Sequence, residues 1–155
     1  MNLEKPRFVD GKPMFIAGLD QRFAFDNTSA IPGLWARFGP HIGKVPGQIG
    51  HVTYGLCYEM DGAAFQYLAG VEVADASNLP SGFTSIQVPA QRYAVFSHRD
   101  HVSKLSETMG AILEQWLPKS GHEAVGSAVM FERYGDTFDP NTGKGDVEVW
   151  APIKS

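Results

Sequence analysis

Cysteine is almost absent from this chain of 155 residues, because Cys57 is the only one. A single cysteine excludes an intrachain disulfide, and no secretory signal is evident, so we expect a reducing, cytoplasmic setting. Long apolar runs are also lacking, and none approaches the roughly 20 residues that a membrane-spanning helix needs. We therefore expect a protein without membrane partners.

Basic clusters are missing as well. The chain has 13 Lys and Arg against 17 Asp and Glu, which gives a net charge of -4. Binding to phosphate backbones needs a concentrated basic face, so we expect no direct nucleic-acid binding. The length and the 43% apolar content favour one globular domain over residues 1–155.

Sequence motifs for cofactors, metals and nucleophiles are lacking too. The glycines form neither a P-loop nor a dinucleotide fingerprint. His98 and His101 are three positions apart, but no Cys or second acidic ligand near them completes a metal set, so we expect no metal and no cofactor. Cys57 lies in an apolar strand pattern without an adjacent His, which favours a small buried side chain over a nucleophile.

The chain does contain apolar periodicity, and the same order of elements occurs twice. A polar tail over 1–12 precedes the first set, and a polar linker over 74–82 separates the two sets. The pattern predicts helices over 31–38 and over 104–117, the second ended by Pro118. Predicted strands cover 13–20, 52–60, 65–73, 83–88, 92–98, 129–134 and 146–153.

Each half, at about 6–74 and 83–155, therefore has the order strand, helix, strand, strand. We predict an α+β fold: a duplicated βαββ unit with one antiparallel sheet, two main helices and a ligand cleft at the pseudo-twofold axis between the halves.

The strand over 129–134 carries one carboxylate, Glu132, among apolar residues. Alternation places Tyr134 on its face, and Trp150 likewise shares a face of the neighbouring strand with Glu148. Glu132 is then either a residue near a strand end that reaches water or pairs with Arg or Lys, or a carboxylate in an aromatic cleft. In the second case it suits an apolar cation, which aromatic rings also attract.

Several segments in order resemble the GyrI-like, or AraC-type effector-binding, domain family. They are 34–38 (Leu-Trp-Ala-Arg-Phe), Tyr54-Gly55, 65–73, 93–98, Phe131-Glu132-Arg133-Tyr134, Phe138-Asp139-Pro140 and 147–153. The resemblance implies a duplicated βαββ fold with Glu132 at the base of the cleft, the carboxylate that related multidrug regulators use for lipophilic cations. At this length the chain is similar to the stand-alone members, such as drug-binding proteins of integron cassettes.

The favoured interpretation is a module that senses or sequesters lipophilic cationic or aromatic compounds. Glu132 supplies the charge, and the walls are formed by Trp35, Tyr54, Tyr93, Tyr134 and Trp150. One alternative is a GyrI-like hydrolase that opens cyclopropanoid genotoxins, with Glu132 as general base. Another is a gyrase-inhibitor-like protein-binding module. A homodimer and a separate regulatory partner both stay open.

Overall fold

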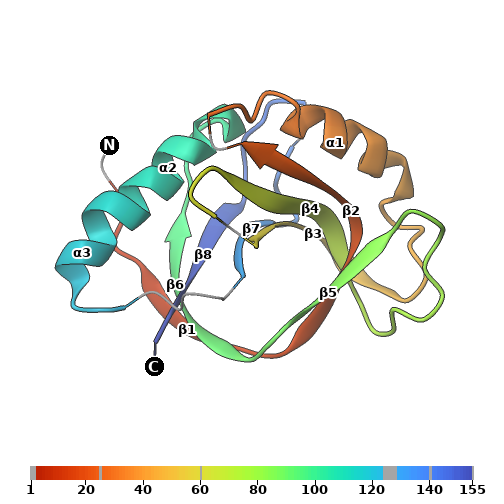
Figure 1. Ribbon diagram of the computed structural model, residues 1–155, viewed down its shortest axis with the longest axis horizontal. Helices are drawn as coiled ribbons and strands as arrows, with labels where there is room; N and C mark the ends of the chain where they lie inside the picture. The colour runs from red at the N-terminus through yellow and green to blue at the C-terminus, as the bar shows by residue number, and fades with distance from the viewer. Residues whose placement is uncertain (1–2, 25, 60, 124–128, 140, 155) are drawn as a thin grey trace. The chain divides into compact units, whose positions relative to one another are not determined.

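The computed structural model describes residues 3–24, 26–59, 61–123, 129–139 and 141–154 (Figure 1). The chain forms two compact units: Pro13–Pro89 is one, and Met1–Lys12 with Ala90–Ser155 is the other. Met60 and Pro140, which fall within predicted segments, lie outside the described residues.

The Pro13–Pro89 unit consists of an antiparallel sheet and one short helix. The sheet order is β3-β4-β2-β5. The predicted helix over 31–38 is confirmed as α1 (Ile31–Phe38), and its apolar residues Leu34 and Phe38 are 1% and 0% exposed. In chain order the elements are β2 (Met14–Ala24), α1 (Ile31–Phe38), the 3-10 turn η1 (Gly39–His41), β3 (Gln48–Tyr58), β4 (Ala64–Val73) and β5 (Thr84–Val88).

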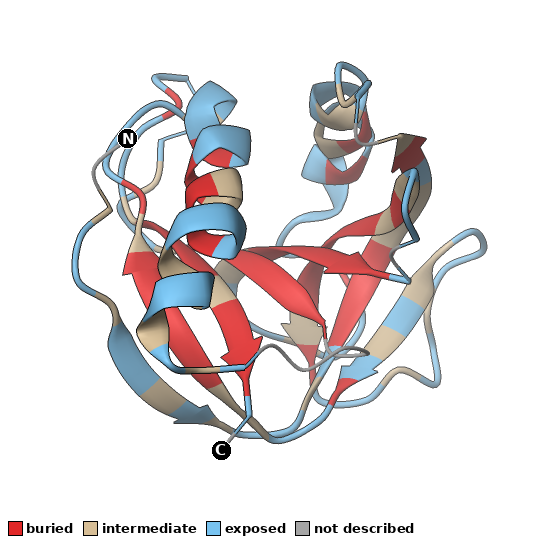
Figure 2. Cartoon of the chain, turned by 60° about the vertical axis from the view of Figure 1, so that its left-hand side comes forward, coloured by how far each residue is buried: buried red, intermediate tan, exposed pale blue. Residues whose placement is uncertain are grey.

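The other unit has a second antiparallel sheet segment, in the order β1-β6-β8-β7, and a longer helical segment. Figure 2 shows this helical segment lying across strands that are largely buried. The elements are β1 (Arg7–Gly11), β6 (Gln91–Ser97), the 3-10 turn η2 (Val102–Lys104), α2 (Leu105–Ala111), the π-helical turn η3 (Ile112–Trp116), α3 (Leu117–Ser120), β7 (Met130–Tyr134) and β8 (Val147–Ile153).

The prediction that Pro118 ends the second helix is wrong. The helical segment continues to Ser120 and ends at Gly121, whose φ of 78° is left-handed. A wider π turn precedes the proline, and the amide of Leu117 donates to the carbonyl of Ile112. In the first turn after such a bulge, the backbone hydrogen bond of the proline position is not required, so the helix continues past Pro118.

Two strands differ from the expected division of the halves. The polar segment before residue 13 contains β1, which pairs with β6, so it belongs with the C-terminal elements. β5, expected in the second half, pairs with β2 of the Pro13–Pro89 unit. Pairing between strands distant in sequence depends on side-chain fit across the ladder, which the pattern within one strand does not contain.

The α+β fold class is confirmed. Each unit contains the predicted order of strand, helix, strand and strand: β2-α1-β3-β4 in one and β6-α2-β7-β8 in the other, with antiparallel neighbours.

Candidate functional site

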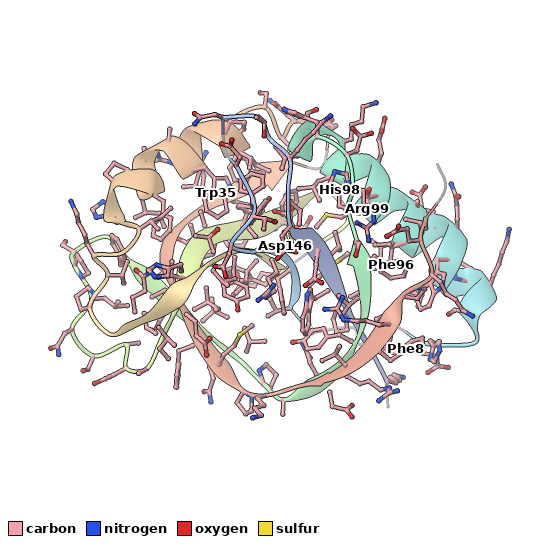
Figure 3. All side chains as sticks on the ribbon, turned by 180° about the vertical axis from the view of Figure 1, so that it is seen from behind. Phe8, Trp35, Phe96, His98, Arg99 and Asp146 are labelled. Carbon is pink, nitrogen blue, oxygen red and sulfur yellow. The ribbon has the colours of Figure 1, made fainter. Side chains whose placement is uncertain are left out.

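Glu132 and Tyr134 lie on the helix-covered face of their sheet. Glu132 is opposite Val149 in the β7–β8 ladder, and Val149 is opposite Phe96 in the β6–β8 ladder. Directly opposed residues of an antiparallel pair project to the same face. The ring of Phe96, labelled in Figure 3, lies 5.0 Å from that of Trp116 in η3, which identifies the covered face.

These two side chains are joined by a short hydrogen bond. The Tyr134 hydroxyl donates to Glu132 Oε1 at 2.7 Å, and the two residues are 8% and 6% exposed. The Tyr134 ring also contacts the ring of Phe138, with 4.9 Å between centroids. Burial of this degree excludes the alternative of a solvated strand end. The result is a buried carboxylate oriented by a phenol, a group able to hold a cation or to accept a proton.

The opposite face of the same sheet carries a cluster of three aromatic rings. Phe131 and Trp150 are direct partners across β7 and β8 and stack with 5.2 Å between centroids. Tyr93 meets both rings edge-on, at 5.3 Å from Phe131 and 5.2 Å from Trp150. The register thus brings two predicted wall residues together, but on the face away from Glu132. Phe131 was missing from the predicted site because the alternation of one strand does not reveal its cross-strand partner.

A second buried carboxylate, Glu148, belongs to this opposite face. Arg7 Nη1 lies 2.7 Å from Glu148 Oε2, and Arg133 Nη1 lies 3.6 Å from Oε1. The Trp150 indole donates to Oε1 at 3.1 Å. Burial raises the pKa of Glu148, but the hydrogen bonds from Arg7 and Trp150 and the two positive charges outweigh it, so the pKa lies below its ordinary value. Glu148 is therefore a charged, well-compensated group.

Trp35 and Tyr54, the other predicted wall residues, belong to the Pro13–Pro89 unit. The Trp35 indole donates to the Tyr67 hydroxyl at 3.0 Å, and Tyr67 is 2% exposed. Tyr67 pairs with Cys57, whereas Tyr54 pairs with Gly70, so strand alternation puts Tyr54 on the face away from Tyr67. Trp35 and Tyr54 thus approach their sheet from different sides.

That unit also holds a polar cluster around Asp20 that sequence reasoning missed. Asp20 Oδ2 accepts from the Tyr58 hydroxyl and from Gln66 Nε2, each at 3.0 Å. Burial, followed by the neighbouring Asp20 charge, raises the pKa of Tyr58 well above its ordinary value. The two donors come from separate strands, so no motif within one segment of the sequence indicates the cluster.

Metal and membrane elements are not found where the structure describes the chain. Within the described ranges, no three His, Cys, Asp or Glu side chains gather as a metal site. Over the same residues, no helix is long and apolar enough to cross a membrane.

Comparison with family models matches residues 4–154 to the GyrI-like small molecule binding domain. The chain belongs to the GyrI-like family. The match spans both units and confirms the resemblance identified from the sequence motifs. Domains of this family are described as binding small molecules.

One curated relative of this GyrI-like domain is the transcriptional regulator BrlR of Pseudomonas aeruginosa. The two are 33% identical over 152 residues, which cover 95% of this chain and 54% of BrlR. The chain thus spans about half the length of that relative.

Solved structures share the fold at lower identity. The structure of SAV2435 bound to tetraphenylphosphonium is 19% identical with a TM-score of 0.79, covering 98% of this chain and 95% of that one. An integron cassette protein from Vibrio cholerae is 17% identical with a TM-score of 0.71, covering 98% and 97%. A hydrolase from Listeria innocua is 11% identical with a TM-score of 0.53, covering 99% and 94%.

Proposed function

We propose that this GyrI-like domain binds lipophilic, cationic aromatic compounds and that Glu132 supplies the negative charge. The observation that carries the proposal is the buried Glu132 carboxylate, held by the Tyr134 hydroxyl at 2.7 Å on an apolar sheet face. A carboxylate that is 6% exposed attracts a cation more strongly than a carboxylate in water does, because the lower effective dielectric constant of the interior screens the pair less.

The electrostatic gain is large enough for useful affinity. A cation about 5 Å from the carboxylate gains about 3 kcal/mol at an effective dielectric constant of about 20, before desolvation. Each ring that faces the cation adds about 0.5 to 2 kcal/mol. Together with apolar burial, this reaches micromolar dissociation constants, at about -8 kcal/mol.

Support comes from relatives with this fold. The structure of SAV2435 holds tetraphenylphosphonium, a lipophilic aromatic cation. Tyr134 is the first candidate for the aromatic wall because it touches Glu132 directly. Trp35, Tyr54, Tyr93 and Trp150 stay predictions as ligand contacts, and the contacts of Tyr93 and Trp150 require a ligand that reaches the sheet face opposite Glu132.

The test is a titration with two ions of the same shape and opposite charge, tetraphenylphosphonium and tetraphenylborate. Glu132→Gln should weaken the binding of tetraphenylphosphonium by about 10- to 100-fold, since it removes the charge of the side chain and keeps its shape. Glu148→Gln is the matched control, because it neutralises a comparably buried carboxylate on the opposite face of the same sheet. That control should change the affinity by less than about threefold.

Two results would overturn the proposal. One is tetraphenylborate binding as tightly as the cation. The other is an equal loss in the Glu132→Gln and Glu148→Gln variants, which would mean that only net charge matters.

A hydrolase is the second candidate, since the same pair could act on water. Glu132 would take a proton from water while Tyr134 orients the carboxylate, and a solved structure described as a hydrolase shares the fold. Incubation with a cyclopropanoid compound distinguishes the two functions. Turnover that Glu132→Gln abolishes supports hydrolysis, and unchanged compound with measurable affinity supports binding alone.

A further inference from the structure

A hollow of about 530 Å³ opens beside β1 and β6, away from the Glu132 carboxylate. It is lined by Glu4, Lys5, Arg7, Val95, Ser97 and Arg99. All six residues belong to one unit, the one formed by Met1–Lys12 and Ala90–Ser155. The volume lies within the range of about 300 to 1,000 Å³ that small-molecule sites occupy.

The lining is basic although the protein as a whole is acidic. Three positive side chains and one negative side chain surround the hollow, in a chain whose net charge is -4. Arg99, labelled in Figure 3, pairs with Glu4 at 2.7 Å, and both side chains are largely exposed. An exposed pair of this kind contributes little and exchanges readily for another anion.

The floor of the hollow joins the face that carries the aromatic cluster. Val95 is directly opposite Trp150, and Ser97 is directly opposite Glu148, in the β6–β8 ladder. Because opposed residues share a face, the half-buried indole of Trp150 stands beside Val95, the apolar residue of the lining. The hollow therefore combines positive charge at its rim with an apolar surface beside its floor.

Arg7 contacts Glu148 through Nη1 and also lines the hollow. Its side chain is 54% exposed, whereas that of Glu148 is 10% exposed. A guanidinium carries five N–H donors, so Arg7 can donate to a second anion while its Nη1 stays with the carboxylate. Arg7 is thus available to a second anion in the hollow.

From this arrangement we propose a second binding site, for a small organic anion with an aromatic body. Its carboxylate or sulfonate group contacts Lys5, Arg7 and Arg99, and its ring lies over Val95 beside Trp150. The ligand charge is opposite to that proposed for the Glu132 site, so the two sites select different compounds.

Naphthalene-2-sulfonate, measured by calorimetry at low salt, is the probe. The double variant Lys5→Gln/Arg99→Gln should weaken the binding of naphthalene-2-sulfonate by about fivefold, the scale of two exposed ion pairs. Arg92→Gln/Lys119→Gln removes the same charge elsewhere and should leave the affinity unchanged. Arg92 pairs with Asp10 and Lys119 lies in α3, so neither lines the hollow.

Comparison ligands test each half of the site. Naphthalene-2-methanol, which lacks the charge, and methanesulfonate, which lacks the ring, should each bind at least about fivefold more weakly. If the double variant fails to fold by circular dichroism, the single variant Lys5→Gln takes its place, with an expected loss of about twofold.

The proposal is overturned if the two double variants lose the same affinity, or if either comparison ligand binds as tightly as the probe. The Glu132→Gln variant should bind naphthalene-2-sulfonate normally, and Lys5→Gln/Arg99→Gln should bind tetraphenylphosphonium normally. Failure of one site is therefore distinguishable from failure of the other.

Discussion

The hydrogen bond between Tyr134 and Glu132 should contribute more to stability than that of Tyr93, a buried tyrosine whose hydroxyl accepts from a neutral amide. Tyr134→Phe removes one oxygen and leaves the ring, so its packing against Phe138 persists. A hydrogen bond to a charged group contributes about 1.5 to 3 kcal/mol, against about 0.5 to 1.5 kcal/mol for a neutral pair. We therefore expect Tyr134→Phe to lower the free energy of unfolding by about 2 kcal/mol.

A double-mutant cycle separates the charge from the hydroxyl. In a Glu132→Gln background the acceptor is a neutral amide oxygen, so Tyr134→Phe should cost only about 1 kcal/mol. The difference of about 1 kcal/mol corresponds to about 2 to 4 °C in Tm for a domain of this size. Urea unfolding of the four proteins, followed by circular dichroism, measures each free energy.

Tyr93→Phe is the matched control, because Tyr93 is also buried but accepts from a neutral amide. Gln91 Nε2 donates to the Tyr93 hydroxyl at 2.6 Å and also to the Val129 carbonyl at 3.3 Å. The amide keeps one partner after the substitution, so the loss should stay below about 1 kcal/mol. Equal costs for Tyr134→Phe in both backgrounds would refute a charged Glu132.

Three further outcomes follow from individual contacts. A Cβ at Gly18 would overlap the backbone carbonyl oxygen of Ala69, so Gly18→Ala should lower the free energy of unfolding by about 2 kcal/mol or more. Gly33 of α1 has open space around it, so Gly33→Ala should raise that free energy by about 0.5 to 1 kcal/mol, and urea unfolding measures both. The folded-state pKa of Glu148 is lowered, so the stability that its charge contributes is present above its ordinary pKa of 4.5 and is lost as the pH falls through the folded value. In Glu148→Gln, the free energy of unfolding should therefore fall less steeply with decreasing pH. The pKa of Tyr58 is raised, so the neutral phenol stabilises the fold less as the pH rises above 10.0. In an ultraviolet titration, Tyr58→Phe should remove a phenol that ionises well above the ordinary range.

Local pattern determined most of the elements and the family of this protein, although it missed β1 and the end of the second helix. The apolar stripe predicted a helix over 31–38, and α1 covers Ile31–Phe38. Alternation alone placed Tyr134 beside Glu132, and the hydrogen bond between them confirms it. Such inferences succeed because helical and strand periodicity are properties of consecutive residues.

Tertiary structure decided everything that depends on which strands pair. The register of β7, β8 and β6 put Trp150 and Tyr93 with Phe131, on the face away from Glu132. The pairing of β1 with β6 brought Arg7 to Glu148 and created the basic hollow from residues distant in sequence. The physical reason is that one strand's alternation defines its two faces but not its neighbour, and the neighbour is selected by contacts summed over the whole sheet.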